Sequence, residues 1–376
     1  MSTPNGDLTP AAIAAWRARS QRLWGTPLAT PMEAFAHLGA VQSQEIQPSK
    51  LTPAMRSAPD GPGRAFAGVG SVDALIESGE VIRTHVLRPT WHTVPALDLR
   101  MMLAATGARV QQLAAGQYRE LGLEASVLER GDKALAAGTA GGRHLAREEA
   151  TEVLAEAGIA DPTGRRLIHL LFHAEIEQAI CSGTPAGGKQ TYANFDERVP
   201  GGPVPVDEAV LALARRFFVS RGPATLKDFT RWASLKVADA KAAVAELELN
   251  EFHVDGRVLY AAEEAPEAGP SGPVVDFVQG FDEMLCSYTD TKDWVVHHSM
   301  PRSAYPDRPR FNSAILLDGQ VIGHWKAAVK KERLVVETLR VRGFTATEVA
   351  ALRRGAERLR VWFDAEELDL QLDSPA

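Results

Sequence analysis

The chain has 376 residues, enough for two to four domains, and its 45% hydrophobic and 24% charged residues are typical of a soluble globular protein. No stretch approaches the ~20 apolar residues of a membrane-spanning helix, and the N-terminus lacks the features of a secretory signal. The net charge of −7 argues against a protein that coats DNA through its overall charge. Two cysteines, Cys181 and Cys286, cannot form a thiolate metal site alone and favour a reducing, cytoplasmic compartment.

Charge is unevenly distributed along the chain. Residues 321–360 contain ten Lys or Arg and four Glu, a local balance of +6. An acidic protein with a basic face can still bind phosphates, because attraction depends on the local field.

The first 100 residues have clear helix start signals. Thr9 is an expected N-cap before a proline at the first helical position, and Thr30-Pro31-Met32-Glu33 is a capping box. The second helix is expected to end near Val41, which would place Gln42-Ser43-Gln44 at a helix exit. With a short helix near residues 72–78 and a hairpin over 81–94, residues 1–100 are predicted to form a first winged-helix unit.

Two further units are expected before residue 262. Residues 101–205 are predicted to be helical with glycine-rich gaps, and they suit a second winged helix. Residues 206–262 have the full order of such a unit, with helices over 207–220, 225–235 and 237–249. A hairpin then turns on Asp255-Gly256, a strong two-residue turn signal.

The C-terminal part changes character after a linker over residues 261–273, which is rich in Glu, Ala, Pro and Gly. Hairpins are expected at Asp318-Gly319 and at a tip over residues 330–333, followed by a helix from Thr345 to about Asp364. The predicted fold class is therefore α+β: tandem winged-helix units, then a β-barrel-like domain with a closing helix over residues 270–376.

Gln42-Ser43-Gln44 is a weak motif as spacing alone, because two glutamines at i and i+2 occur by chance. Together with other segments, however, it resembles the AlkZ/YcaQ group of winged-helix DNA glycosylases, in which a Gln-x-Gln or Gln-x-Asp motif is at the chemical centre. Two departures are Pro89, where the family usually has Gly, and Glu45, where Asp is common. The matching segments are His37–Gln44 with Arg56, Arg83–His92, Arg221–Trp232, Gly280–Glu283 with Tyr288, and Leu317–Trp325.

The resemblance implies a monofunctional DNA glycosylase that acts on N7-alkylated purines in double-stranded DNA, including bulky adducts and interstrand crosslinks. Self-resistance to a DNA-alkylating natural product is one role compatible with that activity, and a monomer is expected. The resemblance places the chemistry at Gln42, Gln44 and Glu45. It also implies DNA contacts by Arg56, Arg83, Arg88, His92, Lys326, Lys330, Lys331 and Arg333.

Two neutral amides suit this reaction. An N7-alkylguanine carries positive charge, so its glycosidic bond is weak, and its loss leaves an oxocarbenium-like sugar. Amide oxygens can position water and stabilise the developing charge without being ionised. Glutamine is not a strong base, so Glu45 is the rival for proton removal, with a plain surface residue as the alternative.

The remaining candidates leave alternatives open. His92 is either a DNA or base contact or a buried structural histidine. Lys330, Lys331 and Arg333 are either a solvated turn or a wedge that enters a DNA groove.

No metal or cofactor is expected. His169 and His173 have i, i+4 spacing without the glutamate of a zinc protease motif, and no nucleotide-binding glycine motif follows a strand. One alternative function is a winged-helix transcriptional regulator, although residues 237–249 contain a single basic residue, Lys241. Another is a nucleoside hydrolase, which would not lose affinity for duplex DNA steeply with salt.

Overall fold

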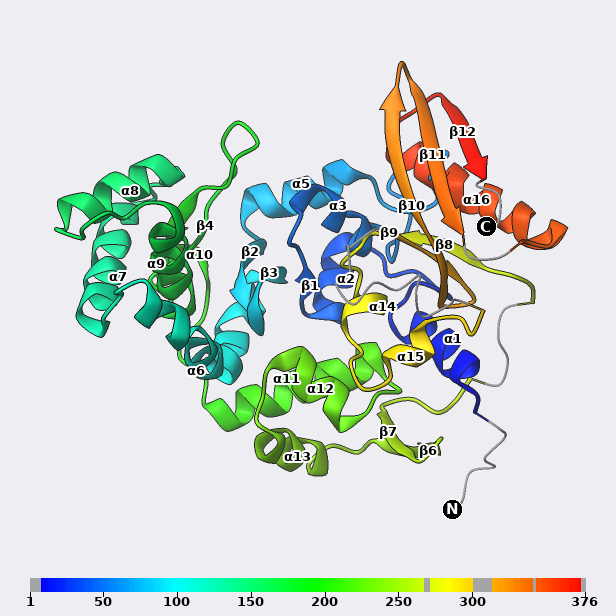
Figure 1. Ribbon diagram of the computed structural model, residues 1–376, viewed down its shortest axis with the longest axis horizontal. Helices are drawn as coiled ribbons and strands as arrows, with labels where there is room; N and C mark the ends of the chain where they lie inside the picture. The colour runs from blue at the N-terminus through cyan, green and yellow to red at the C-terminus, as the bar shows by residue number, and fades with distance from the viewer. Residues whose placement is uncertain (1–7, 267–270, 300–312, 341–342, 373–376) are drawn as a thin grey trace.

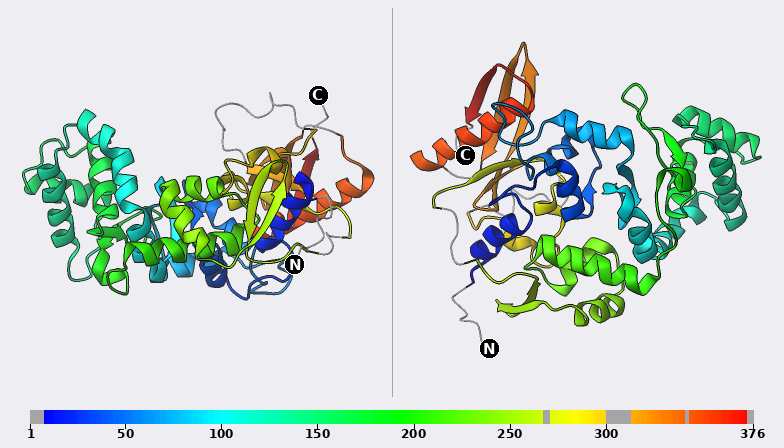
Figure 2. Two further views of the ribbon diagram at one scale, coloured as in Figure 1. Left: turned by 90° about the horizontal axis from the view of Figure 1, so that it is seen from below. Right: turned by 180° about the vertical axis from the view of Figure 1, so that it is seen from behind.

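The computed structural model describes residues 8–266, 271–299, 313–340 and 343–372. Helices and small sheets form a mixed α+β arrangement, with a helical lobe at one end and the largest sheet at the other (Figure 1). Helices α11–α13 lie below the centre, and the N-terminal helices lie between them and the largest sheet (Figure 2). In the described part of the chain, no helix is long and apolar enough to cross a membrane.

The N-terminal region begins as its caps predict. Thr9 caps the first helix by accepting from the Ala12 N–H, and Thr30 accepts from the Glu33 N–H. The elements are α1 (Pro10–Ser20), α2 (Pro31–Leu38), β1 (Val41–Gln42), α3 (Ile46–Ser49), α4 (Leu51–Ala54), α5 (Val69–Ser78), β2 (Val81–Val86) and β3 (Arg88–Pro95).

Helix α2 ends at Leu38, earlier than predicted, and Gln42 lies on a strand and not at a helix exit. Gly39 ends α2 with a φ of 74°, a conformation that glycine adopts without strain. The chain then forms β1, which joins the predicted hairpin in an antiparallel sheet of order β1-β3-β2. Gln42 therefore lies on an edge strand opposite His92, where a ladder fixes its backbone.

The middle region is helical, as predicted, and carries a small hairpin. The glycine-rich segment over residues 183–188 forms most of the loop between its two strands. The elements are α6 (Ala96–Glu120), α7 (Ala125–Thr139), α8 (Arg147–Glu156), α9 (Gly164–Ile176), β4 (Ile180–Ser182), β5 (Tyr192–Asn194) and α10 (Phe195–Arg198).

The elements predicted for residues 206–262 are confirmed in order. The capping box of the second helix forms between Thr225 and Asp228, and Asp255 and Gly256 make the turn with φ of 48° and 72°. The elements are α11 (Val206–Arg221), α12 (Leu226–Ala233), α13 (Val237–Ala245), β6 (Asn250–Val254) and β7 (Arg257–Ala261).

The C-terminal sheet is open rather than a barrel. Its order is β12-β11-β10-β9-β8, and the end strands β8 and β12 do not pair within the described residues. Helix α16 packs against both end strands. The elements are β8 (Val275–Val278), α14 (Glu283–Cys286), α15 (Lys292–Val295), β9 (Ser313–Leu317), β10 (Gln320–Lys330), β11 (Arg333–Arg340), α16 (Ala346–Trp362) and β12 (Glu367–Leu372).

One large hydrophobic core runs from the N-terminal helices through the middle helices to the C-terminal sheet. A smaller cluster, which includes Trp16, Phe252 and Trp294, joins α1 to the β6–β7 hairpin and α15. The regions therefore share buried surface, and the segments that meet near Gln42 come from distant parts of the sequence.

Candidate active site

Gln42 is held at both its backbone and its side chain. Its N–H donates to Glu283 Oε1 at 2.9 Å, and its side-chain Oε1 accepts from Arg88 Nη2 at 2.7 Å. Only 7% of the residue is exposed. Because a guanidinium only donates, the amide oxygen of Gln42 faces Arg88 and the amide nitrogen faces the other way.

His92 supports this arrangement from the opposite strand. Its Nδ1 lies 3.0 Å from the Thr90 carbonyl oxygen, which only accepts, so Nδ1 carries the proton and Nε2 accepts from Arg88 at 3.3 Å. Burial and the neighbouring Arg88 hold the pKa of His92 well below its usual range, so the ring is neutral. His92 has no exposed surface in this structure, which favours the buried structural alternative over a DNA contact.

Arg88 joins two regions of the chain. Its Nη1 donates to the Trp232 carbonyl on α12 at 3.2 Å, while its Nη2 donates to Gln42 and His92. Burial lowers the pKa of the Arg88 guanidinium, and the facing Glu283 partly offsets this. Arg88 thus bridges β1, β3 and α12, and its role in DNA binding stays a prediction.

Gln44 and Glu45 differ from Gln42 because both are exposed. Arg83 fixes the backbone at Ser43 and Gln44 by donating to their carbonyl oxygens at 3.0 Å and 3.3 Å, and it stacks over the Trp91 ring at 4.3 Å. Burial lowers the pKa of Arg83. The Gln44 side chain makes no hydrogen bond within the described residues, so its amide is free to meet a substrate.

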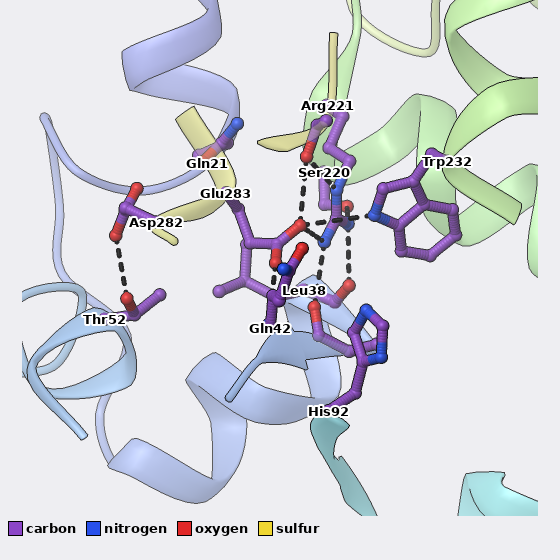
Figure 3. A network of polar contacts seen from close by, with 12 residues as sticks. Gln21, Leu38, Gln42, Thr52, His92, Ser220, Arg221, Trp232, Asp282 and Glu283 are labelled. Carbon is purple, nitrogen blue, oxygen red and sulfur yellow. Dashed lines mark hydrogen bonds and ion pairs between the residues drawn. The ribbon is translucent and has the colours of Figure 1, made fainter. Parts of the chain in front are cut away.

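Glu283 lies at the centre of this hydrogen-bond network, and the sequence did not identify it as a site residue. Its Oε2 accepts from Arg221 Nη2 at 2.7 Å, Trp232 Nε1 at 3.2 Å and Ser287 Oγ at 3.0 Å, while its Oε1 holds Gln42 (Figure 3). Burial alone would raise the pKa of Glu283, but Arg221 and Arg88 outweigh it and hold that pKa below its usual range. Its segment, Gly280–Glu283, is one of those that carry the family resemblance, and this resemblance is the one signal in the sequence that points to it.

Arg56 is fully buried in this structure. It has no exposed surface, and its guanidinium makes two hydrogen bonds to Asp282, at 2.8 and 3.0 Å, as well as bonds to Gln21 and Thr52. A phosphate cannot reach this guanidinium in the structure without DNA, and the expected DNA contact stays a prediction. Arg56 instead ties α4 to the segment that carries Glu283, and Thr52 adds a bond to Asp282 (Figure 3).

Four cations of the β10–β11 hairpin are exposed: Lys326, Lys330, Lys331 and Arg333. The hairpin projects from the sheet (Figure 1), and its turn residues Lys331 and Glu332 have φ of 49° and 65°. Lys326 pairs with Glu337 at 2.7 Å and Arg333 with Glu367 at 2.6 Å. Lys330 and Lys331 have no carboxylate partner within the described residues.

Two cavities border the turn of α3. One, of about 430 Å³, lies between α3, the end of α5 and the β4–β5 loop, and Arg83 and Lys50 line it. The other, of about 620 Å³, lies between α3 and the C-terminal sheet, with Trp325 and Trp362 in its wall. Gln47 lines both, so the exposed Gln44 and Glu45 directly precede a helix that has open space on two sides. Among the described residues, no cluster of three or more His, Cys, Asp or Glu side chains suits a metal ion.

A mixed α+β fold with exposed amide and carboxylate side chains beside two open cavities describes a polar site that a large substrate can reach. The family model of AlkZ-like DNA glycosylases matches residues 35–362. The chain therefore belongs to this family of enzymes, which hydrolyse N-glycosyl bonds in DNA.

Two relatives agree with this assignment. An interstrand DNA cross-link repair glycosylase of Streptomyces sahachiroi is 26% identical over 346 residues, 86% of this chain and 89% of that protein. The solved structure of Streptomyces sahachiroi DNA glycosylase AlkZ matches with a TM-score of 0.80 over 96% of this chain and 99% of that one, at 21% identity. The second match shows a shared fold.

Proposed function

We propose that this chain excises N7-alkylated purines from duplex DNA, including bulky adducts and interstrand crosslinks, either in repair or in self-resistance. The observation that carries the proposal is the exposed Gln44 amide, two residues after the buried Gln42, whose side chain is hydrogen-bonded to Arg88. We further propose that the enzyme is a cytoplasmic monomer built from tandem winged-helix units.

In the proposed mechanism the two glutamines have different roles. The Gln44 oxygen positions water near C1′ and stabilises the oxocarbenium-like sugar through its dipole. The Gln42 side-chain oxygen already accepts a hydrogen bond from Arg88, so Gln42 holds β1 in place. Its amide nitrogen is the group left to face the substrate. Glu45 remains the candidate for a general base.

A crosslinked substrate requires an open active site for steric reasons. A base that is covalently tied to the opposite strand cannot be fully extruded into an enclosed pocket. Cavities that flank α3, the helix that begins two residues after Gln44, suit a duplex that stays largely stacked. The crosslink repair activity named for the Streptomyces relative supports the same substrate class.

The decisive experiment measures abasic sites. A labelled duplex with one N7-methylguanine is incubated with excess enzyme, treated with alkali and resolved on a gel. Strand breaks at the lesion, and none in an unmodified duplex, are the expected result. A fully active preparation that leaves the lesion intact would overturn the proposal, and DNA binding without excision would favour the regulator.

A further inference from the structure

A third cavity, of about 710 Å³, lies away from α3, between α6 and the α12–α13 turn; we term it the α6–α12 cleft. Four of its lining residues are cations: Arg109 on α6, Lys227 and Arg231 on α12, and Lys236 just before α13. None of the described residues that line it is acidic. In a chain with 48 Asp and Glu against 41 Lys and Arg, such a cleft departs from the average surface.

Three of these cations are available to a ligand. Lys227 pairs with Asp290 at 2.7 Å. Arg109, Arg231 and Lys236 are exposed and have no carboxylate partner within the described residues, and Arg109 donates only to Gln112, at 3.1 Å. Converging positive charges without a partner favour a polyanion, because each would otherwise repel the next.

The apolar part of the lining narrows the class of ligand. Leu113 on α6 is 50% exposed and Val237 on α13 is 62% exposed, one on each side of the cleft. Cations beside aliphatic surface suit a chain of phosphates and sugars better than a small inorganic anion. Helix α13 itself offers only Lys241 for base contacts, so binding here would read the backbone rather than the sequence.

The α6–α12 cleft is connected to Gln42 through hydrogen bonds of Arg88. Trp232 follows Arg231 directly, and its carbonyl accepts from Arg88, whose other nitrogen holds Gln42. The Arg88 guanidinium therefore links α12 directly to Gln42. Figure 1 shows α6 and α12 on the other side of the β1-β3-β2 sheet from the β10–β11 hairpin.

We propose that the α6–α12 cleft binds the phosphodiester backbone of the duplex, on the side of the lesion opposite the β10–β11 hairpin. This inference rests on the proposed function, since it assumes that duplex DNA is the substrate. A site that contacts phosphates without reading bases suits an enzyme that must act wherever damage occurs.

The test replaces Arg109, Arg231 and Lys236 together by Ala. A matched control replaces three exposed cations of the distant α7–α8 lobe, Arg130, Lys133 and Arg143, by Ala. Binding to an undamaged duplex is measured from about 50 to 200 mM salt, because each lost phosphate contact lowers the slope of log K against log salt by about 0.9. Excision of N7-methylguanine is followed with saturating enzyme.

We expect the cleft variant to lose up to about three units of slope and to bind at least about ten-fold more weakly at the lower salt concentrations. Its single-turnover rate at saturation should stay within about two-fold of wild type, and the control should bind normally. Equal slopes for the two variants, or equal losses in both, would overturn the inference. Failure of the wild-type protein to bind and excise would instead overturn the proposed function.

Discussion

The junction around Glu283 and the β10–β11 hairpin are both rich in cations, and they use them in opposite ways. In the junction, Arg56 and Arg221 have no exposed surface and pair with Asp282 and Glu283. At the hairpin, Lys326, Lys330, Lys331 and Arg333 lie in solvent, and the ion pairs of Lys326 and Arg333 are exposed. A guanidinium therefore indicates a DNA contact only when the surrounding fold leaves it accessible.

The energetic consequences of the two arrangements also differ. Removing one partner of a buried pair leaves a charge without solvent or counterion, which costs far more than the pair contributes. An exposed pair is screened by water and salt, and its loss costs little. The first kind of cation fixes where Gln42 lies, whereas the second kind remains available to a phosphate.

The largest expected effect comes from Glu283→Ala, because Arg221 would be left buried with no counterion. We expect the free energy of unfolding to fall by about 3–5 kcal/mol, as measured by chemical denaturation. The matched control is Glu367→Ala, which breaks the exposed pair with Arg333 and should cost less than about 1 kcal/mol. Similar losses in the two variants would contradict the contrast between the regions.

The sequence predicted the elements whose signals are local. Thr225 and Asp228 form the expected capping box, and Asp255-Gly256 and Asp318-Gly319 make the expected turns. These features depend on residues within a few positions of each other, so the sequence alone determines them.

The features that the sequence did not predict involve partners far apart in the chain. Gln42 is on a strand because β3, some fifty residues later, pairs with it. Arg56 is buried because Asp282, 226 residues away, meets it. Neither contact leaves a periodic signal, and resemblance to a family points to a residue without stating whether it is exposed. The role of Glu283 could not be predicted for the same reason.

The two glutamines provide a second test of the comparison. Gln44→Ala and Gln42→Ala should each lower single-turnover excision by about ten-fold or more, equivalent to about 1.4 kcal/mol per decade, with little change in DNA affinity. Only Gln42→Ala should also lower the stability, by about 1–3 kcal/mol, because it removes the acceptor of the partly buried Arg88. Wild-type excision rates in both variants would show that the chemistry lies elsewhere.

The hairpin should show a smaller effect on simple substrates. Replacing Lys330, Lys331 and Arg333 together by Ala should reduce the salt slope of duplex binding by two to about three units, since Arg333 is partly engaged by Glu367. Excision of bulky or crosslinked adducts should fall more than that of N7-methylguanine, because opening the duplex around a tethered base needs a wedge. An unchanged slope with equal activity on both substrates would make the hairpin ordinary surface.

Glu45→Gln is expected to have the smallest effect on catalysis. Glu45 is exposed, and no side-chain hydrogen bond or ion pair within the described residues orients it toward a water. A positively charged base is already a good leaving group, so removing a proton from water should matter less than positioning it and stabilising the sugar. We therefore expect a milder loss than either glutamine variant gives, with the acid limb of the pH–rate profile retained. Complete loss with a flattened acid limb, while Gln42→Ala stays near normal, would make Glu45 the general base and reduce the amides to a supporting role.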